Sequence, residues 1–265
     1  MRFQGSPCWY ELGTTDLDAA GGFYARILGW QVTDSGMEGF DYRLAKSGGD
    51  MVAGMMSNAG QQGSPPPNWL IYFAADDCDQ TAGDIRAAGG TVCHGPADIP
   101  GTGRFAVVAD PQGAVFGLLQ PELSQMSAED RAKAEAGGGA FDPQKPGHGS
   151  WNELMSSDPQ AAYGFYAGIF GWTKGDTMDM GAMGTYQLLR HNGADIGAVM
   201  GLGDAPVPVW LPYFGIDGPV TTVIDAIKAA GGIIHQGPME VPGPAWIAVA
   251  QDPQGAWFAV TGPQE

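Results

Sequence analysis

The sequence predicts an α+β protein built from two copies of one domain, and two observations carry this prediction. The first is an internal repeat, because residues 8–119 align with residues 150–261 at an offset of 142 positions. The second is that strand-like and helix-like hydrophobic patterns alternate in the same order within each copy. A repeat of this length indicates a duplicated domain and not a solenoid unit. The chain of 265 residues is long enough for two domains of ordinary size.

Three motifs make the repeat plain. "GFYARILGW" at 22–30 recurs 142 residues later as "GFYAGIFGW" at 164–172. "AAGG" at 87–90 and "DPQGA" at 110–114 recur unchanged at the same offset. A polar, Ala-rich stretch followed by Gly and Pro separates the copies, and this composition is typical of a linker. We therefore predict a first domain over residues 1–120, a linker over 121–147 and a second domain over 148–265.

Each copy is expected to begin with a strand and a helix. In "CWYELGTT" (residues 8–15) an aromatic and apolar run precedes a polar turn, as in a strand. The next residues place an apolar stripe on one helix face, made of Ala20, Phe23, Tyr24, Ile27 and Leu28. Thr15 or Asp16 can cap the start of this helix, and Gly29 can end it in the left-handed conformation.

Seven further strands and a second helix complete the copy, which gives a β-α-β-β-β module used twice. The strands are expected near residues 30–34, 41–46, 51–57, 68–75, 91–95, 105–109 and 115–119, and the helix near 77–88. Asp110 to Gly113 suits a type I turn between the last two strands. Since each residue of this motif has a backbone role, we interpret it as turn geometry and not as chemistry.

Composition excludes several classes of partner. Only 12 Lys and Arg stand against 29 Asp and Glu, and the net charge of -17 disfavours nucleic acid and anionic membranes. No signal-peptide core and no apolar run long enough to span a membrane is seen, so we expect a cytoplasmic protein. Cys8, Cys78 and Cys93 have neither the number of a disulfide framework nor the spacing of a zinc site.

The ordered motifs resemble those of the glyoxalase, bleomycin-resistance and extradiol-dioxygenase superfamily, also called the vicinal oxygen chelate fold. The resemblance rests on the first strand, the "D-L" turn, the "FY" helix, the following Gly-Trp and the final "DPxG" hairpin, and it covers both copies. It implies that two βαβββ modules curl around a cup-shaped cavity in each domain and bind a small molecule there. It leaves open whether modules pair within or between the halves, and whether the chain is a monomer with pseudo-twofold domains or a homodimer.

The same resemblance implies where metal ligands would lie, and the sequence departs from the family there. The first-strand ligand position falls on Trp9 and Trp151, and the last-strand carboxylate position on Gly117 and Ala259. None of these side chains can bind a divalent ion. The four histidines are scattered and lack a helical metal-pair spacing. We therefore expect no metal cofactor at the usual centre, although a non-standard site stays open.

Glu11 and Glu153 are the candidate catalytic residues. Strand alternation places each glutamate on the same face as the neighbouring tryptophan, and the family register turns this face toward the cup. A carboxylate beside an indole in an apolar cup could act as an acid or base. The alternative is structural, with each carboxylate bound to a neighbouring donor that holds the modules together.

Aromatic side chains supply the candidate ligand-binding residues. They fall in or near predicted strands, where they could line two cups, although ordinary core packing is the alternative for each: Trp9, Trp69, Tyr72, Trp151, Trp210, Tyr213, Trp246 and Trp257. Arg104 could anchor an anionic group of a ligand, or lie on the surface.

Three functions follow from these residues. The favoured hypothesis is a protein that binds a small organic molecule in aromatic-lined cups without the usual metal centre. The alternative is a lyase, isomerase or dioxygenase that uses Glu11, Glu153 or a non-standard metal site. In the third, neither cup is occupied and the protein has a structural role.

Overall fold

The α+β class with two tandem domains is confirmed. The computed structural model describes residues 3–37, 39–59, 63, 65–122, 139–181, 184–242 and 245–264. The strands form two eight-stranded mixed sheets, in the orders β2-β3-β4-β1-β5-β8-β7-β6 and β10-β11-β12-β9-β13-β16-β15-β14. The exact domain boundaries stay a prediction, and residues 123–138 of the predicted linker lie outside the described residues.

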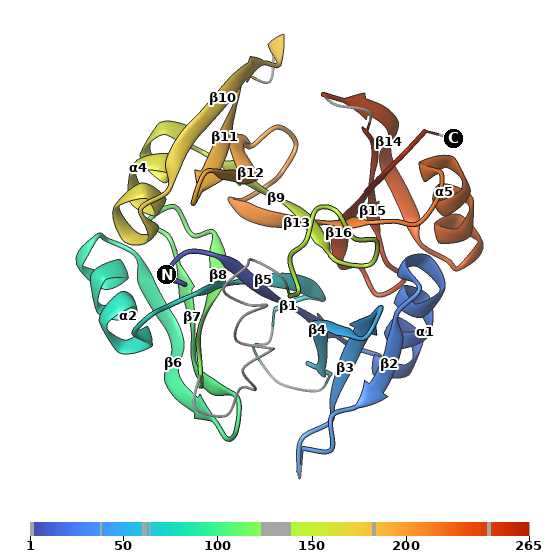
Figure 1. Ribbon diagram of the computed structural model, residues 1–265, viewed down its shortest axis with the longest axis horizontal. Helices are drawn as coiled ribbons and strands as arrows, with labels where there is room; N and C mark the ends of the chain where they lie inside the picture. The colour runs from blue at the N-terminus through green and yellow to red at the C-terminus, as the bar shows by residue number, and fades with distance from the viewer. Residues whose placement is uncertain are drawn as a thin grey trace. The chain divides into compact units, whose positions relative to one another are not determined.

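The elements of the two repeats follow one another in the same order (Figure 1). In the first repeat they are β1 (Pro7–Thr14), α1 (Leu17–Leu28), β2 (Gln31–Asp34), β3 (Tyr42–Ser47), β4 (Asp50–Ser57), β5 (Asn68–Ala74), α2 (Cys78–Ala87), β6 (Thr91–Ile99), β7 (Gly103–Ala109) and β8 (Val115–Pro121). In the second repeat they are β9 (Gly149–Ser156), α4 (Pro159–Phe170), β10 (Thr173–Asp179), β11 (Thr185–His191), β12 (Ala194–Gly201), β13 (Val209–Gly215), α5 (Val220–Ala229), β14 (Ile233–Val241), β15 (Ala245–Gln251) and β16 (Trp257–Gly262).

The first helix of each repeat begins and ends as its sequence predicts. Asp16 accepts a hydrogen bond from the Ala19 backbone N–H, and Gly29 ends the helix with a φ of 70°. In the second repeat Asp158 and Gly171 do the same for α4, with a φ of 71° at the glycine. These caps satisfy helix-end groups that would otherwise lack partners.

Each strand of the β1–β4 group has one face toward α1 and one face away from it. Helix α1 packs on β2 and β4, and the strand residues beneath it, such as Leu12, Ala45 and Met55, are fully buried. Glu11 and Leu44 both pair with Gly54, so these residues share the opposite face. We call the face turned away from the helix the open face, here and in the other strand groups.

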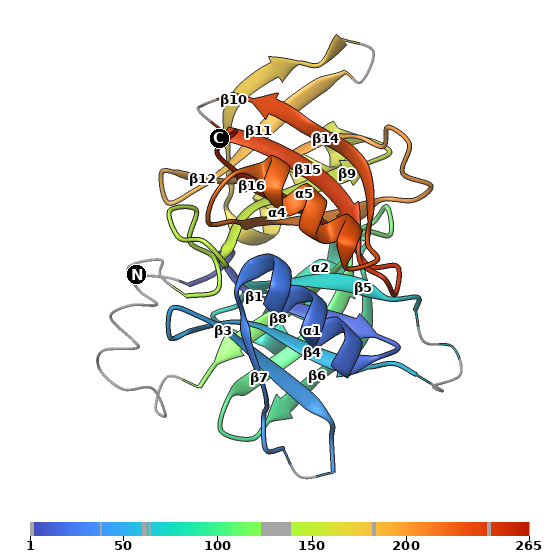
Figure 2. The same ribbon diagram turned by 90° about the vertical axis from the view of Figure 1, so that its right-hand side faces the viewer.

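The chain forms two compact units, and each unit combines half of one repeat with half of the other. Unit one comprises Met1–Cys8, Ile71–Gly138 and Trp151–Trp210, and unit two comprises Trp9–Leu70, Gly139–Ser150 and Leu211–Glu265. Within unit one α2 contacts α4 (Figure 1), and within unit two α1 contacts α5 (Figures 1 and 2). The modules that share a core therefore come from different repeats.

A buried hydrogen-bond chain joins the two repeats inside each unit. In unit two the Trp69 Nε1–H donates to the Tyr24 hydroxyl (2.9 Å), which donates to Asp252 Oδ2 (3.0 Å). In unit one Trp210 Nε1–H donates to the Tyr166 hydroxyl (3.0 Å), and this hydroxyl donates to Asp110 Oδ2 (3.2 Å).

The two aspartates belong to the repeated "DPQG" turn. The Gly113 N–H donates to the Asp110 carbonyl (3.0 Å), which confirms the predicted turn. The Asp110 side chain also accepts from the N–H groups of Gln112 and Ala114. Burial raises the pKa of the equivalent Asp252 carboxyl, while hydrogen bonds to it act in the opposite direction. Besides shaping a hairpin, the motif therefore holds the "FY" helix of the other repeat.

The tryptophan that ends each repeated nonapeptide is also core. Trp30 stacks on Tyr24 with 5.7 Å between ring centroids, and its Nε1–H donates to the Gly147 carbonyl (2.7 Å). Trp172 stacks on Tyr166 at 5.5 Å in the same way. Among the described residues, no helix has the length and apolar character needed to cross a membrane.

Candidate functional site

The open face of β1–β4 carries a hydrogen-bonded chain of three side chains. Trp9 and Glu11 lie on β1, two residues apart and on one face, and Tyr42 opens β3. The Trp9 Nε1–H donates to the Tyr42 hydroxyl (3.2 Å), which in turn donates to Glu11 Oε2 (2.8 Å). All three side chains are partly exposed, unlike the fully buried Tyr10 and Leu12 beside them on β1.

The phenol at the centre of this chain stays protonated. Burial raises the pKa of Tyr42 far above its ordinary value, and the negative charge of Glu11 raises it further. Because its hydroxyl accepts from Trp9 and donates to Glu11, the ring is held in one orientation. The three side chains thus form a preorganised surface of two aromatic rings with a carboxylate at one end.

The second repeat builds the same chain on the open face of β9–β12. Trp151 Nε1–H donates to the Tyr186 hydroxyl (2.8 Å), and this hydroxyl donates to Glu153 Oε2 (2.8 Å). Burial is again the main cause that raises the pKa of Tyr186, followed by the charge of Glu153. This copy lies in unit one, whereas the copy around Tyr42 lies in unit two.

Sequence reasoning missed both tyrosines. They occupy equivalent places in "DYRLAK" and "TYQLLR", 144 residues apart, so the repeat itself carried a signal. What the sequence lacks is the register of β3 against β4 and β1, which brings Tyr42 opposite Met56 and Glu11 opposite Gly54. A Cβ added at Gly54 would overlap the Tyr42 hydroxyl, so this glycine leaves room for the phenol.

The residues at the family's metal positions do not fit a metal centre. Trp9 and Trp151 use their indole N–H groups as donors, and an indole offers no lone pair to a metal. Tyr72 lies opposite Gly117, where a Cβ would overlap the tyrosine ring, and Tyr213 lies opposite Ala259. Over the described residues, no three His, Cys, Asp or Glu side chains come together as a metal-binding group.

The other predicted ligand-binding residues lie on both faces of their sheets. Trp69 and Trp210 are on the helix side, where they donate to Tyr24 and Tyr166. Tyr72 and Tyr213 are buried on the open face, opposite the family's last-strand position. Trp257 shares this face with Ala259 and is 44% exposed, with His235 stacked on it at 4.0 Å between centroids.

Arg104 and Trp246 occupy equivalent positions in the two repeats. Arg104 is two residues from the buried Ala106, and Trp246 is two residues from the buried Ala248, so both lie on the helix-side face of their sheets. The Arg104 Nη1 donates to Asp98 (2.7 Å), and its Nε and Nη2 donate to Asp79 (2.5 and 3.0 Å). These carboxylates raise the pKa of Arg104, and the guanidinium lowers the pKa of Asp79. Two carboxylates thus already engage the guanidinium.

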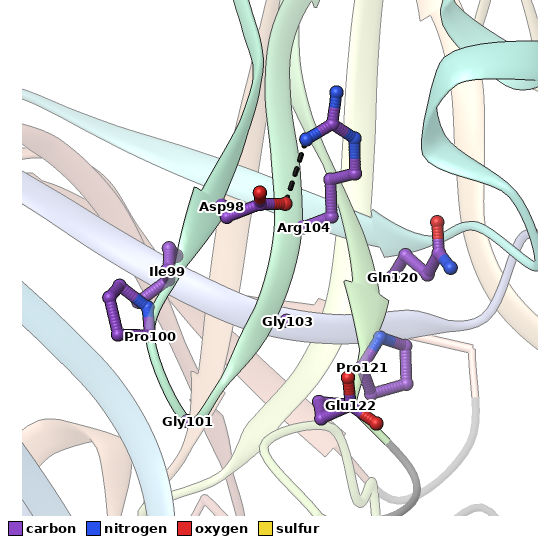
Figure 3. Close-up of a pocket in the computed structure, with 9 residues that line it drawn as sticks. All are labelled: Asp98, Ile99, Pro100, Gly101, Gly103, Arg104, Gln120, Pro121 and Glu122. Carbon is purple, nitrogen blue, oxygen red and sulfur yellow. Dashed lines mark hydrogen bonds and ion pairs between the residues drawn. The ribbon is translucent and has the colours of Figure 1, made fainter.

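A cavity of about 310 Å³ adjoins this arginine, between the β6–β7 turn and the end of β8 (Figure 3). Asp98, Arg104, Gln120 and Glu122 contribute polar groups to its lining, and Pro100 and Pro121 contribute apolar surface. The Gln120 Oε1 accepts from the Cys78 N–H at the start of α2 (2.8 Å). Asp98, Arg104 and Gln120 thus all have partners in β6, β7 or α2.

Comparison with known proteins agrees with this architecture. The sequence profile of the glyoxalase/bleomycin resistance protein/dioxygenase superfamily matches residues 8–118. The chain is 33% identical over 268 residues to "Putative glyoxylase CFP32" of Mycobacterium tuberculosis, covering 98% of this chain and 95% of that protein. It is 31% identical to "Anthracycline biosynthesis protein DnrV" of Streptomyces peucetius, covering 97% of this chain and 92% of that protein.

Solved structures share the fold at lower identity. The Mn(II)-bound glyoxalase from Novosphingobium aromaticivorans has a TM-score of 0.67 at 20% identity, with 100% of this chain and 84% of that chain covered. The 2,3-dioxygenase LapB from Pseudomonas sp. KL28 has a TM-score of 0.65 at 14% identity, with 99% and 94% covered. From its near full-length relatives and its fold, the chain belongs to the glyoxalase/bleomycin resistance protein/dioxygenase superfamily.

Proposed function

We propose that this protein binds a flat organic molecule on the open faces of β1–β4 and β9–β12, without the metal centre of metal-using superfamily members. The observation that carries the proposal is the hydrogen-bonded Trp–Tyr–Glu chain, which both repeats build with the same donors and acceptors. Each chain begins at the strand position where the family's first metal ligand would lie.

The geometry favours stacking over coordination. The Trp9 and Trp151 N–H groups and both tyrosine hydroxyls already have partners, so these partly exposed rings can offer a ligand only their apolar surface. Rings held in place lose little conformational entropy when a ligand binds. Aromatic pairs contribute about 0.5–1.5 kcal/mol beyond the burial of their surface.

The names of two relatives support the same ligand class. The DnrV and DauV proteins of Streptomyces are named for anthracycline biosynthesis, and anthracyclines contain a flat fused-ring system. The relatives named as glyoxylases support instead a small substrate and an enzymatic role. The aromatic surfaces of both repeats favour the flat ligand.

The test is binding of a soluble tricyclic dye, acridine orange, before and after dialysis against a chelator. We expect equal affinity in both states, and a Kd at least about tenfold higher in the Trp9→Ala/Trp151→Ala double variant. Trp246→Ala is the matched control, because this tryptophan lies on the helix-side face. Binding that a chelator abolishes and a stoichiometric divalent metal restores would overturn the metal-free proposal, as would unchanged affinity in the double variant.

A second function is favoured by the carboxylates. Glu11 and Glu153 each accept a hydrogen bond from a tyrosine hydroxyl, and a carboxylate in this position can move a proton to or from a bound ligand. A lyase or isomerase would then lose turnover in Glu11→Gln or Glu153→Gln while still binding ligand. A binder would show no turnover in the unaltered protein.

A further inference from the structure

One aromatic ring on the open face of β1–β4 lies beyond the Trp–Tyr–Glu chain. Phe40, in the β2–β3 turn, stacks on Tyr42 with 6.0 Å between centroids and 23° between ring planes. Tyr42 cannot easily rotate, because its hydroxyl is bound at both ends. Phe40 is 42% exposed, so part of its ring is accessible to a ligand.

Backbone N–H groups in the described part of the β2–β3 turn form hydrogen bonds. The Ser35 N–H donates to the Tyr42 carbonyl (2.8 Å), which continues the β2–β3 ladder, and the Gly36 N–H donates to Asp34 Oδ1 (2.7 Å). The Phe40 N–H donates to the Met37 carbonyl (3.4 Å) within the turn. Phe40 is thus held by its own backbone N–H and by the contact of its ring with Tyr42.

The second repeat has no counterpart to this ring. Tyr42 and Tyr186 are 144 residues apart, and the same offset places Gly184 at the position of Phe40. Gly184 has a φ of 80°, a backbone conformation that suits glycine. The two otherwise matching open faces therefore differ by one aromatic ring.

Charge limits the kind of ring that fits the first repeat. The Glu11 carboxylate ends the hydrogen-bonded series that begins at Trp9 and Tyr42. The whole protein carries a net charge of -17. Arg43 is turned to the other face, opposite Met55, and is paired with Asp41 and Asp18. Lys46 lies on the open face, two residues beyond Leu44 and at the opposite end of β3 from Tyr42. Beside Glu11 an anionic ligand would be repelled, whereas exposed aromatic faces attract a cation.

From this geometry we propose that Phe40 extends the open face of β1–β4 into a platform for a fused-ring ligand that is neutral or positively charged, and that the second repeat lacks this specificity. The inference rests on the proposed function. The Phe40 side chain has no group that can donate or accept a proton, so we expect it to affect which ligand binds and not what is done to the ligand.

The test uses the full chain with Trp151→Ala, so that the first repeat is measured alone. Acridine orange, a tricyclic cation, is compared with benzylamine, a single-ring cation, and with 9-anthracenecarboxylate, a tricyclic anion. Adding Phe40→Ala should raise the Kd for acridine orange about five- to tenfold and change that for benzylamine less than about twofold. In the Trp151→Ala protein the anion should bind more weakly than acridine orange.

The matched control is Val115→Ala, an apolar side chain of β8 that is 42% exposed, as Phe40 is, and that lies outside the β1–β4 group. It should leave all three affinities unchanged. If Phe40→Ala leaves the acridine orange Kd within twofold while Trp9→Ala weakens it, this inference is overturned and the proposed function stands. If acridine orange fails to bind the unaltered protein, both are overturned.

Discussion

Four tyrosine hydroxyls perform the same task in this molecule. Each accepts a hydrogen bond from an indole N–H and donates one to a carboxylate, in the sets Trp69–Tyr24–Asp252, Trp210–Tyr166–Asp110, Trp9–Tyr42–Glu11 and Trp151–Tyr186–Glu153. Two sets are buried in the cores and two lie on open faces. Because the indole N–H, the hydroxyl and the carboxylate of each set are hydrogen-bonded to one another, the free-energy cost of burying these polar groups is reduced.

These hydroxyls predict a loss of stability in alkali. Burial raises the pKa of Tyr24, Tyr42, Tyr166 and Tyr186, so the folded protein keeps protons that the unfolded chain releases near pH 10. Their contribution is therefore complete below pH 10 and is lost as pH rises above it, by up to about 1.4 kcal/mol per tyrosine per pH unit.

Urea unfolding between pH 8 and 11, with tyrosinate absorbance followed in parallel, measures this effect. The folded protein should ionise only part of its 8 tyrosines, and the remainder should ionise on unfolding. The Tyr42→Phe/Tyr186→Phe variant should lose stability less steeply above pH 10. Ionisation of every tyrosine near pH 10 in the folded state would contradict the prediction.

At the same scale, the structure shows what single residues in the sequence can and cannot reveal. Trp69 and Tyr72 are both predicted to line a cup, but they stand three residues apart on β5 and lie on opposite faces of it. The sequence pattern does not show which of the two side chains points toward the helix, because both faces of this strand are apolar. That choice depends on Tyr24 and Asp252, which lie far away in the sequence.

The helices are the elements that sequence predicts best, because their signals are local. Asp16, Gly29 and the apolar stripe between them define α1 without reference to any other segment. Strand β6 ends at Ile99 instead of residue 95, and β7 begins at Gly103 instead of residue 105, because their pairing continues through a bulged ladder. The hydrogen bonds among Trp9, Tyr42 and Glu11 need three strands in register, so a local sequence pattern does not predict them.

The helices also retain glycines that their packing does not require. A Cβ added at Gly22, Gly83, Gly164 or Gly168 would have no heavy atom within 4 Å, and all four positions are exposed. Gly21 differs, because its Cβ would lie 3.3 Å from Val32 Cγ1. Helix propensity therefore favours alanine at the four open positions.

Each of these four Gly→Ala variants should raise the free energy of unfolding by about 0.5–1 kcal/mol. Equilibrium denaturation in urea gives the measurement, and Gly21→Ala is the control that should gain less or lose stability. A destabilised Gly22→Ala would show that the helix surface is in contact with something that the structure does not contain.

For the whole molecule, the decisive contacts connect the two repeats. Gln112 of the first repeat accepts hydrogen bonds from Ser156 and from the Asp158 N–H, at the start of α4 in the second. Tyr24 and Tyr166 bind aspartates of the opposite repeat. The sequence predicts the duplication and the order of elements, but it leaves open which modules share a core, because identical motifs can pair in either way.

This arrangement predicts that the halves remain together when the chain is cut. A protease site introduced between residues 122 and 139 should yield, after cleavage, two fragments that elute as one particle and separate only in denaturant. Size-exclusion chromatography before and after cleavage tests this, with unaltered protein plus protease as the control. Fragments that separate under native conditions would show that each repeat has a self-sufficient core.

The reciprocal Tyr–Asp bonds carry a further consequence, in terms of symmetry. Tyr24 binds Asp252 and Tyr166 binds Asp110, so each repeat supplies a tyrosine to the other and receives one in return. That exchange is the contact pattern of a twofold homodimer, in which one patch meets its own copy. A single repeat would have to find a second chain at sufficient concentration. Joining the two covalently makes the encounter intramolecular, and it frees each copy to change alone, as Phe40 and Gly184 illustrate.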